Sequence, residues 1–229
     1  VLLDAVAGPM PGDPYFAPPP ARPYASELDA PPARLRIGFM ARAPRDVEIA
    51  ADCADIARAA ATACERLGHV VEERHPVALD EAEHIAHYVT IVAGNTARAL
   101  DAVGQKLERP LVQDDVEPLT WAVAERGREL RVHEWLATVE YVHGFGRRLA
   151  RFWHDDAFDL LLTPSMGAPP PEIGYITSTR EEPFRAFIRS APFGVFTLPF
   201  NMSGQPAISL PLHWDANGLP RGVQLIAAH

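Results

Sequence analysis

The sequence of 229 residues lacks a long hydrophobic run and carries more acidic than basic side chains. No apolar stretch approaches the roughly 20 residues that a membrane-spanning helix needs, and no signal peptide is visible. The formal net charge of −9 at pH 7 argues against a nucleic-acid partner, which needs a basic face. We therefore predict a cytoplasmic protein that binds neither membrane nor nucleic acid.

Cysteine is also scarce, since Cys53 and Cys64 are the only two in the sequence. Their spacing within one helical pattern places them about 16 Å apart along the helix axis. A disulfide needs Cα atoms within about 7 Å of each other. We therefore predict two free thiols, which are typical of a reducing compartment.

What the chain does contain is an alternation of strand and helix patterns. Residues 35–40 have the short apolar pattern of a strand, and residues 69–73 follow as a second strand. Between them, residues 47–67 repeat apolar side chains every three to four positions, which predicts a helix, and Gly68 is suited to end it. Strand, helix and strand with short joints predict a βαβ crossover and therefore a parallel pair of strands.

The rest of the sequence continues this pattern. Asp80 and Glu83 have the spacing of a capping box, so a helix is predicted from 80 to 103. The other expected elements are a proline-rich surface loop at 9–34, helices at 132–154 and 182–190, strands at 158–163, 207–212 and 223–227, and a loop at 164–181. Turn residues at 215–218 predict that the last two strands form a hairpin. The fold class predicted for residues 1–229 is α/β, one domain with a mixed, partly parallel sheet flanked by helices.

Five segments carry a recognisable pattern, and they occur in an informative order. They are residues 1–15, 35–39, 159–164, 193–212 and 218–226. Taken together, they resemble the amidase-signature hydrolases, a family of serine enzymes that cleave carboxamides. Within that family, the sequence Phe-Asn-Met-Ser-Gly-Gln-Pro at 200–206 is similar to bacterial amidases related to the hydrolases that open cyclic aminohexanoate dimers. The resemblance covers nearly the whole chain.

The resemblance implies a specific chemistry. In this family a serine attacks the carboxamide, a second serine in a cis peptide relays the proton, and a lysine acts as the base, all on a loop rich in glycine and serine. Such a base is needed because a serine hydroxyl alone is a poor nucleophile, and backbone N–H groups then hold the oxyanion. The resemblance implies a small-molecule amide substrate and no metal or organic cofactor.

None of the family's catalytic residues can be matched in this sequence. No two of its six serines are adjacent, and Lys106, the single lysine, lies in a polar segment without a glycine- and serine-rich loop. In the family the catalytic loop precedes the region that is matched here. We therefore predict a fragment, the incomplete C-terminal portion of an amidase, that supplies scaffold and part of the substrate pocket and is inactive alone.

The candidate substrate-binding residues are Thr163, Phe193, Phe196, Thr197 and Asn201. The resemblance implies that this half of the fold builds part of the pocket, and loops at strand ends line pockets in open α/β sheets. Two other interpretations stay open. The phenylalanines can belong to the core, and the asparagine can satisfy turn backbone through its side chain.

Two other functions stay open as well. The chain can be a split or degenerate subunit that hydrolyses nothing and binds a partner, such as the missing N-terminal half or a second copy of itself. It can also be an amidotransferase subunit acting on charged tRNA, which the acidic balance disfavours.

A pair of histidines is a candidate metal site. His84 and His87 are three residues apart on one predicted helix, a spacing that can turn two imidazoles toward one metal ion. No third ligand has a matching spacing, so we expect an exposed helix face and predict no metal site.

Overall fold

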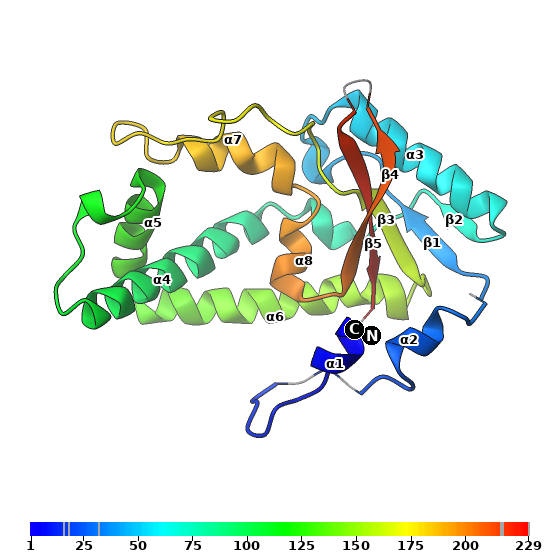
Figure 1. Cartoon of the computed structure of the whole chain (residues 1–229), viewed down its shortest axis with the longest axis horizontal. Coiled ribbons are helices and arrows are strands. Elements are labelled where there is room, and N and C mark those ends of the chain that lie inside the picture. Colours follow the sequence, from blue (N-terminus) through cyan, green and yellow to red (C-terminus); the bar gives the residue numbers. More distant parts are fainter. Residues whose placement is uncertain (16, 18, 32, 216–217, 229) are drawn as a thin grey trace.

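The computed structural model describes residues 1–229 except 16, 18, 32, 216, 217 and 229, and its centre is a five-stranded sheet (Figure 1). The strands are β1 (Arg36–Phe39), β2 (Val70–Glu72), β3 (Leu160–Pro164), β4 (Ala207–Trp214) and β5 (Pro220–Ala227), in the spatial order β2-β1-β3-β5-β4. β2, β1 and β3 are parallel, whereas β5 is antiparallel to both β3 and β4. The predicted mixed, partly parallel sheet is therefore confirmed.

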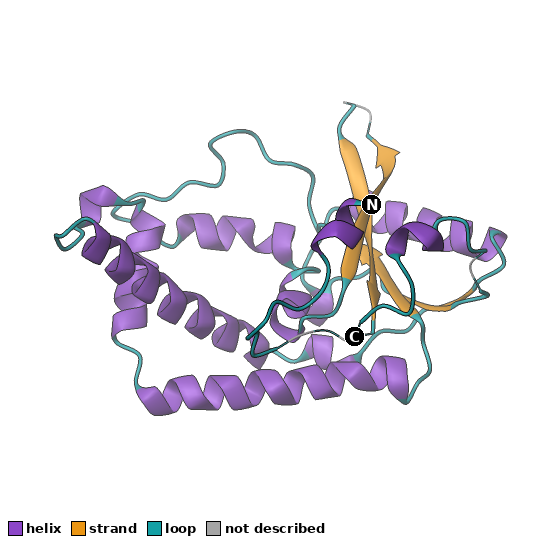
Figure 2. Ribbon diagram, turned by 60° about the horizontal axis from the view of Figure 1, so that its bottom comes forward, coloured by secondary structure: helices purple, strands orange, loops and turns teal. Residues whose placement is uncertain are grey.

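Helices lie on both sides of the strands in the two ribbon views (Figure 1, Figure 2). The α-helices are α1 (Leu2–Val6), α2 (Tyr24–Glu27), α3 (Ala51–Arg66), α4 (Glu83–Lys106), α5 (Pro118–Arg128), α6 (Val132–His154), α7 (Arg185–Gly194) and α8 (Leu198–Ser203). Three short 3-10 helices join them: η1 (Pro44–Asp46), η2 (Val77–Asp80) and η3 (Gln113–Asp115). α4 and α6 extend together away from the sheet toward α5 (Figure 1).

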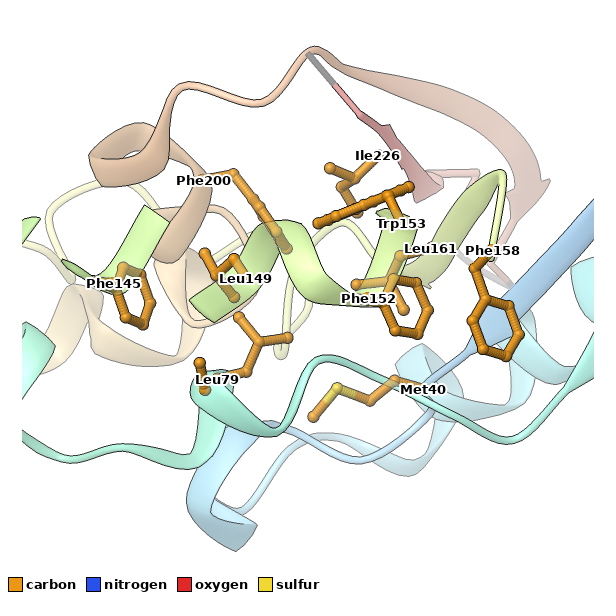
Figure 3. Close-up of a cluster of buried hydrophobic side chains, with 11 residues drawn as sticks. Met40, Leu79, Phe145, Leu149, Phe152, Trp153, Phe158, Leu161, Phe200 and Ile226 are labelled. Carbon is orange, nitrogen blue, oxygen red and sulfur yellow. The ribbon is translucent and has the colours of Figure 1, made fainter. Parts of the chain in front are cut away.

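Each face of the sheet is covered by a different helix. Successive side chains of a strand point to opposite faces, and the neighbours Leu161 and Leu162 of β3 accordingly join different clusters. Leu162 packs with Ile56 and its neighbours on α3. Leu161 packs with Phe152 of α6, among the aromatic side chains that Figure 3 shows along that helix. The core is thus two apolar layers with the sheet between them.

Several elements match the prediction closely. α6 spans the predicted 132–154 without a difference, and its stripe buries Phe145, Leu149 and Phe152. β1 and β2 are parallel as the βαβ pattern predicts, and β4 and β5 form the predicted antiparallel pair, although turn residues 216 and 217 lie outside the described part. Both cysteines carry free thiols, and burial raises the pKa of Cys53 to about 11.

Two helices were not predicted, and two expectations were wrong. The helices that were not predicted, α5 and α8, carry Pro118 and Pro199 in their first turns, where a missing N–H costs nothing. The predicted loop at 9–34 also contains α2. The capping box was wrong as well: Asp80 lies in η2, and α4 begins at Glu83 without a side-chain cap.

Gly127 sets how closely α5 approaches α4. A Cβ atom at this position would lie 2.0 Å from the backbone oxygen of Ala93, which cannot move without the helix. Gly146 offers a matched comparison, since it also lies inside a helix but a Cβ there meets no atom within 4 Å.

We therefore expect Gly127→Ala to destabilise the fold by about 1–3 kcal/mol through overpacking. Gly146→Ala should instead stabilise it by about 0.5–1 kcal/mol, because alanine has the higher helix propensity. Chemical denaturation of both variants and the parent chain measures the difference. Equal effects of the two substitutions would contradict the close packing of α4 on α5.

β4 leaves an apolar strand at the edge of the sheet. It pairs with β5 on one side, and seven of its eight residues are exposed. Ile208, Leu212 and Trp214 are 56%, 57% and 64% exposed. An exposed apolar edge strand is a template for pairing with another chain.

We expect the 229-residue chain alone to form dimers or larger species in sedimentation velocity at micromolar concentration. Ile208→Lys should reduce this association, because a charge on an edge strand disfavours pairing. Ala59→Lys places the same charge on an exposed position of α3 and should leave association unchanged. A monomer that unfolds cooperatively would contradict the expectation.

Candidate functional site

The connections of the parallel strands diverge between β1 and β3. The helix that follows β1, α3, covers one face of the sheet, whereas α6, which leads into β3, covers the other. In open α/β sheets, ligands bind in the crevice outside the carboxyl ends of strands at such a point. The residues that follow Phe39 on β1 and Pro164 on β3 therefore define where a site is expected.

On the β1 side, the carboxylate of Asp80 gathers three partners. The Arg42 guanidinium donates to it through two nitrogens, at 2.8 and 3.1 Å, and the Arg45 backbone N–H donates at 2.7 Å. His75 Nε2 lies 2.9 Å from the same carboxylate. The Arg42 bond lowers the pKa of Asp80 far below its usual range, with smaller contributions from Arg45 and His75.

This carboxylate holds a strained turn in place. Arg45 and Asp46 both have positive φ, 57° and 53°, which is costly for residues with a side chain. Because Asp80 is ionised and fully bonded, it is suited to anchoring the loop and not to taking a proton during a reaction.

On the β3 side, the side chain of Gln224 connects two of the predicted pocket residues. The side-chain amide of Gln224, on β5, donates to Thr163 Oγ1 at 3.4 Å and to the carbonyl oxygen of Phe196 at 3.1 Å. All three residues are buried. Sequence reasoning missed Gln224, although a glutamine inside an apolar strand is a signal of a buried polar partner.

The other predicted pocket residues lie on the α7–α8 segment. Phe193 is half-buried on α7, and Thr197 is half-buried at the N-cap of α8 with its hydroxyl 3.4 Å from the Gly194 carbonyl oxygen. Asn201 is exposed and lies inside α8, so the interpretation of Asn201 as a turn residue was wrong. Phe196 packs as a core residue, whereas Phe193 stays partly accessible.

Two serines that are far apart in the sequence meet next to this segment. Ser165 directly follows β3, Ser209 lies on β4, and their hydroxyl oxygens are 2.7 Å apart. Gly222 of β5 lies between them, and a Cβ atom there would come within 2.9 Å of both oxygens. The missing side chain of Gly222 is what allows the two hydroxyls to reach each other.

No base accompanies these serines among the residues that the structure describes. Lys106 is exposed at the C-terminal end of α4, and Ser165 Oγ is hydrogen-bonded to the hydroxyl of Ser209. A serine hydroxyl without a neighbouring base is a poor nucleophile. The pair is therefore suited to hydrogen bonding with a ligand and not to attacking it.

The paired histidines are not on an exposed helix face, which corrects that expectation. His84 is 2% exposed and stacks on Phe145 with ring centroids 5.4 Å apart. His87 stacks on Tyr141 at 4.1 Å and shares a hydrogen bond of 3.0 Å with Thr138 Oγ1. In the described part of the chain, no cluster of three or more histidine, cysteine or acidic side chains is arranged to hold a metal ion.

Comparison with known proteins gives a consistent result. The sequence model of the family described as Amidase matches residues 1–229. A 6-aminohexanoate-cyclic-dimer hydrolase of Paenarthrobacter ureafaciens is 37% identical over 234 residues, which cover 100% of this chain and 47% of that protein. A lipoamidase of Enterococcus faecalis is 26% identical over 84% of the chain and 29% of its own length. The chain thus spans about half the length of the cyclic-dimer hydrolase, and less of the lipoamidase.

Solved structures agree with the sequence comparison. The structure of a 6-aminohexanoate cyclic dimer hydrolase complexed with substrate superposes with a TM-score of 0.92 and 36% identity, over 99% of this chain and 48% of that one. A bacterial aryl acylamidase of the amidase signature family shares the fold, with a TM-score of 0.66 and 18% identity over 90% of this chain and 42% of that one. Among the described residues, no helix is long and apolar enough to cross a membrane.

The buried imidazole of His84 predicts a pH dependence of stability. Burial lowers its pKa, followed by the charge of Arg45, so the unfolded chain binds the proton more tightly than the folded one. Stability should therefore be complete above pH 6.5 and fall as the pH drops below that value. His84→Phe keeps the stack on Phe145 and cannot titrate. Its melting temperature should therefore decrease less between pH 7 and pH 5 than that of the parent chain. An equal loss in variant and parent would contradict this role.

Proposed function

The chain belongs to the amidase family, and from this premise we propose that it forms part of an amide hydrolase. The acyl group of a carboxamide would pass to a serine, and water would then release the carboxylate, leaving ammonia or an amine as the other product. The substrate class we propose is a small linear or cyclic carboxamide. The free thiols support a further proposal, a cytoplasmic location.

The observation that carries this proposal is the extent of the similarity. The cyclic-dimer hydrolase of Paenarthrobacter ureafaciens is 37% identical over an alignment that covers 100% of this chain, and the solved relative superposes over 99% of it. Similarity of this extent includes the strand ends and the α7–α8 segment, where ligands are expected. A relative of that kind makes a cyclic diamide a reasonable first substrate to test.

The part that this chain plays is a scaffold with a portion of the substrate pocket. We propose Thr163, Phe193, Phe196, Thr197 and Asn201 as pocket residues, with Thr163 and Phe196 acting as its buried frame through Gln224. The catalytic serines and lysine would belong to polypeptide outside these 229 residues. The exposed position of the single lysine, at the end of α4, supports that division.

Two purified proteins test the proposal. The chain alone should not hydrolyse the 6-aminohexanoate cyclic dimer or a linear amide. A chimera in which the chain replaces the aligned region of the Paenarthrobacter ureafaciens enzyme should hydrolyse at least one of them, because the remaining half supplies the nucleophile and base. The matched control is the same enzyme with the aligned region deleted.

Each outcome has a separate meaning. Hydrolysis by the chain alone would overturn the assignment of catalysis to other polypeptide. A chimera that folds, as judged by circular dichroism and a cooperative melt, but hydrolyses no amide would favour a non-catalytic subunit that binds a partner. Transfer of the amide nitrogen of glutamine to the side-chain carboxylate of a charged tRNA in the presence of ATP, measured as a separate assay, distinguishes an amidotransferase subunit.

A further inference from the structure

The hydroxyl pair of Ser165 and Ser209 has unused hydrogen-bonding capacity. Two serine hydroxyls offer two donors and four lone pairs, and their mutual bond of 2.7 Å uses one of each. One donor and three lone pairs remain. Ser209 is exposed and Ser165 is half-buried, so this capacity is accessible from outside.

The pair is not needed to hold the sheet together. The backbone N–H of Ser165 donates to the Gly222 carbonyl oxygen at 3.1 Å, and β5 is already bonded to both β3 and β4 by their ladders. A hydrogen bond between partly exposed hydroxyls adds little net stability, because water bonds to both groups in the unfolded chain. The hydroxyl pair therefore requires a glycine at position 222 but adds little stability. This combination is typical of a binding role.

The frame around the pair is rigid. Thr163, Gln224 and Ser209 are register partners across β3, β5 and β4, so they share one face of the sheet. The loop after Ser165 is fixed at its second residue, because Gly167 donates its N–H to the Pro192 carbonyl oxygen at 2.9 Å. The hydroxyls are thus held at a strand end beside the α7–α8 segment, where a ligand is expected.

A remaining donor next to remaining acceptors suits a ligand that presents both kinds of group. A secondary amide does so, since its N–H donates and its carbonyl oxygen accepts. A carboxylate would use the donor but leave the lone pairs facing its own negative oxygens, and no cation is bonded to either hydroxyl among the described residues.

We propose that Ser165 and Ser209, separated by Gly222, bind an amide group of the substrate that is not the one cleaved. This inference rests on the proposed function and narrows its substrate class to compounds with two amide groups. The bound amide is not cleaved here because the pair has no base to activate a hydroxyl. Gly222 sets the specificity by keeping the space between the hydroxyls open.

Binding by the 229-residue chain itself tests this, with the 6-aminohexanoate cyclic dimer as the probe in a saturation-transfer NMR titration. The double variant Ser165→Ala/Ser209→Ala should bind the dimer roughly tenfold more weakly, as expected from the loss of two hydrogen bonds. Ser26→Ala is the control, because its hydroxyl bonds only the nearby Pro23 carbonyl oxygen. Its affinity should equal that of the parent chain.

Gly222→Ala provides a second variant in which both serines remain. Its Cβ would lie 2.9 Å from two rotatable hydroxyls and 3.3 Å from the backbone oxygen of Leu210, so the melting temperature should fall only slightly while the affinity for the dimer falls clearly. Unchanged affinity in both variants, or no binding by the parent chain, would overturn the inference.

Activity is read separately in the chimera. An inactive chimera together with serine-dependent binding by the chain would overturn the proposed function and leave this site standing. An active chimera together with binding that ignores the two serines would overturn this site and leave the proposed function standing.

Discussion

The structure depends on burying β3 on both of its faces at once. Leu161 and Leu162 are neighbours in the sequence and are almost completely buried against different helices, α6 and α3. A strand in this position must be apolar on both sides, and the chain must cross from one face of the sheet to the other around it. Because of this crossing, the helix connected to β1 and the helix connected to β3 lie on opposite faces of the sheet, and neither covers the carboxyl ends of these two strands. The same constraint buries Thr163, whose hydroxyl donates to the Pro164 carbonyl oxygen and accepts a hydrogen bond from the amide of Gln224.

The sequence predicts those elements whose signal is local. The stripe along 132–154 repeats over many turns, so α6 could be placed to the residue, and the apolar run at 158–163 located β3 within two residues. Contacts between distant segments left no such signal. Asp80 has the spacing of a helix cap, but Arg42, 38 residues earlier, takes its carboxylate instead. Propensity rules do not reveal such a partner. Helices α5 and α8 were missed for a related reason, because a proline is accommodated only in the first turn and the sequence did not show where these helices begin.

The same difference applies to the candidate site. Thr163 and Phe196 were predicted from the family resemblance, as part of the segment between Asp159 and Asn201. The structure joins them through Gln224, which no motif marked. No two serines are neighbours in the sequence, so the sequence predicts no serine pair. In space, Ser165 and Ser209 are in contact although they are 44 positions apart, because β3 and β4 flank the same glycine on β5. Strand register created this pair, and register is not visible before the sheet is assembled.

Polar groups in this fold divide into those that are saturated and those that are not. Asp80 has three partners, the Arg42 guanidinium, the Arg45 backbone N–H and His75, and it lies beside strained backbone. Groups of that kind fix loops, since every further ligand would have to displace an existing bond. The hydroxyls of Ser165 and Ser209 retain donor and acceptor capacity on a rigid frame. In the proposed function, this chain contributes no nucleophile but can still select the substrate, because selection requires only fixed groups that are left unpaired when the wrong compound binds.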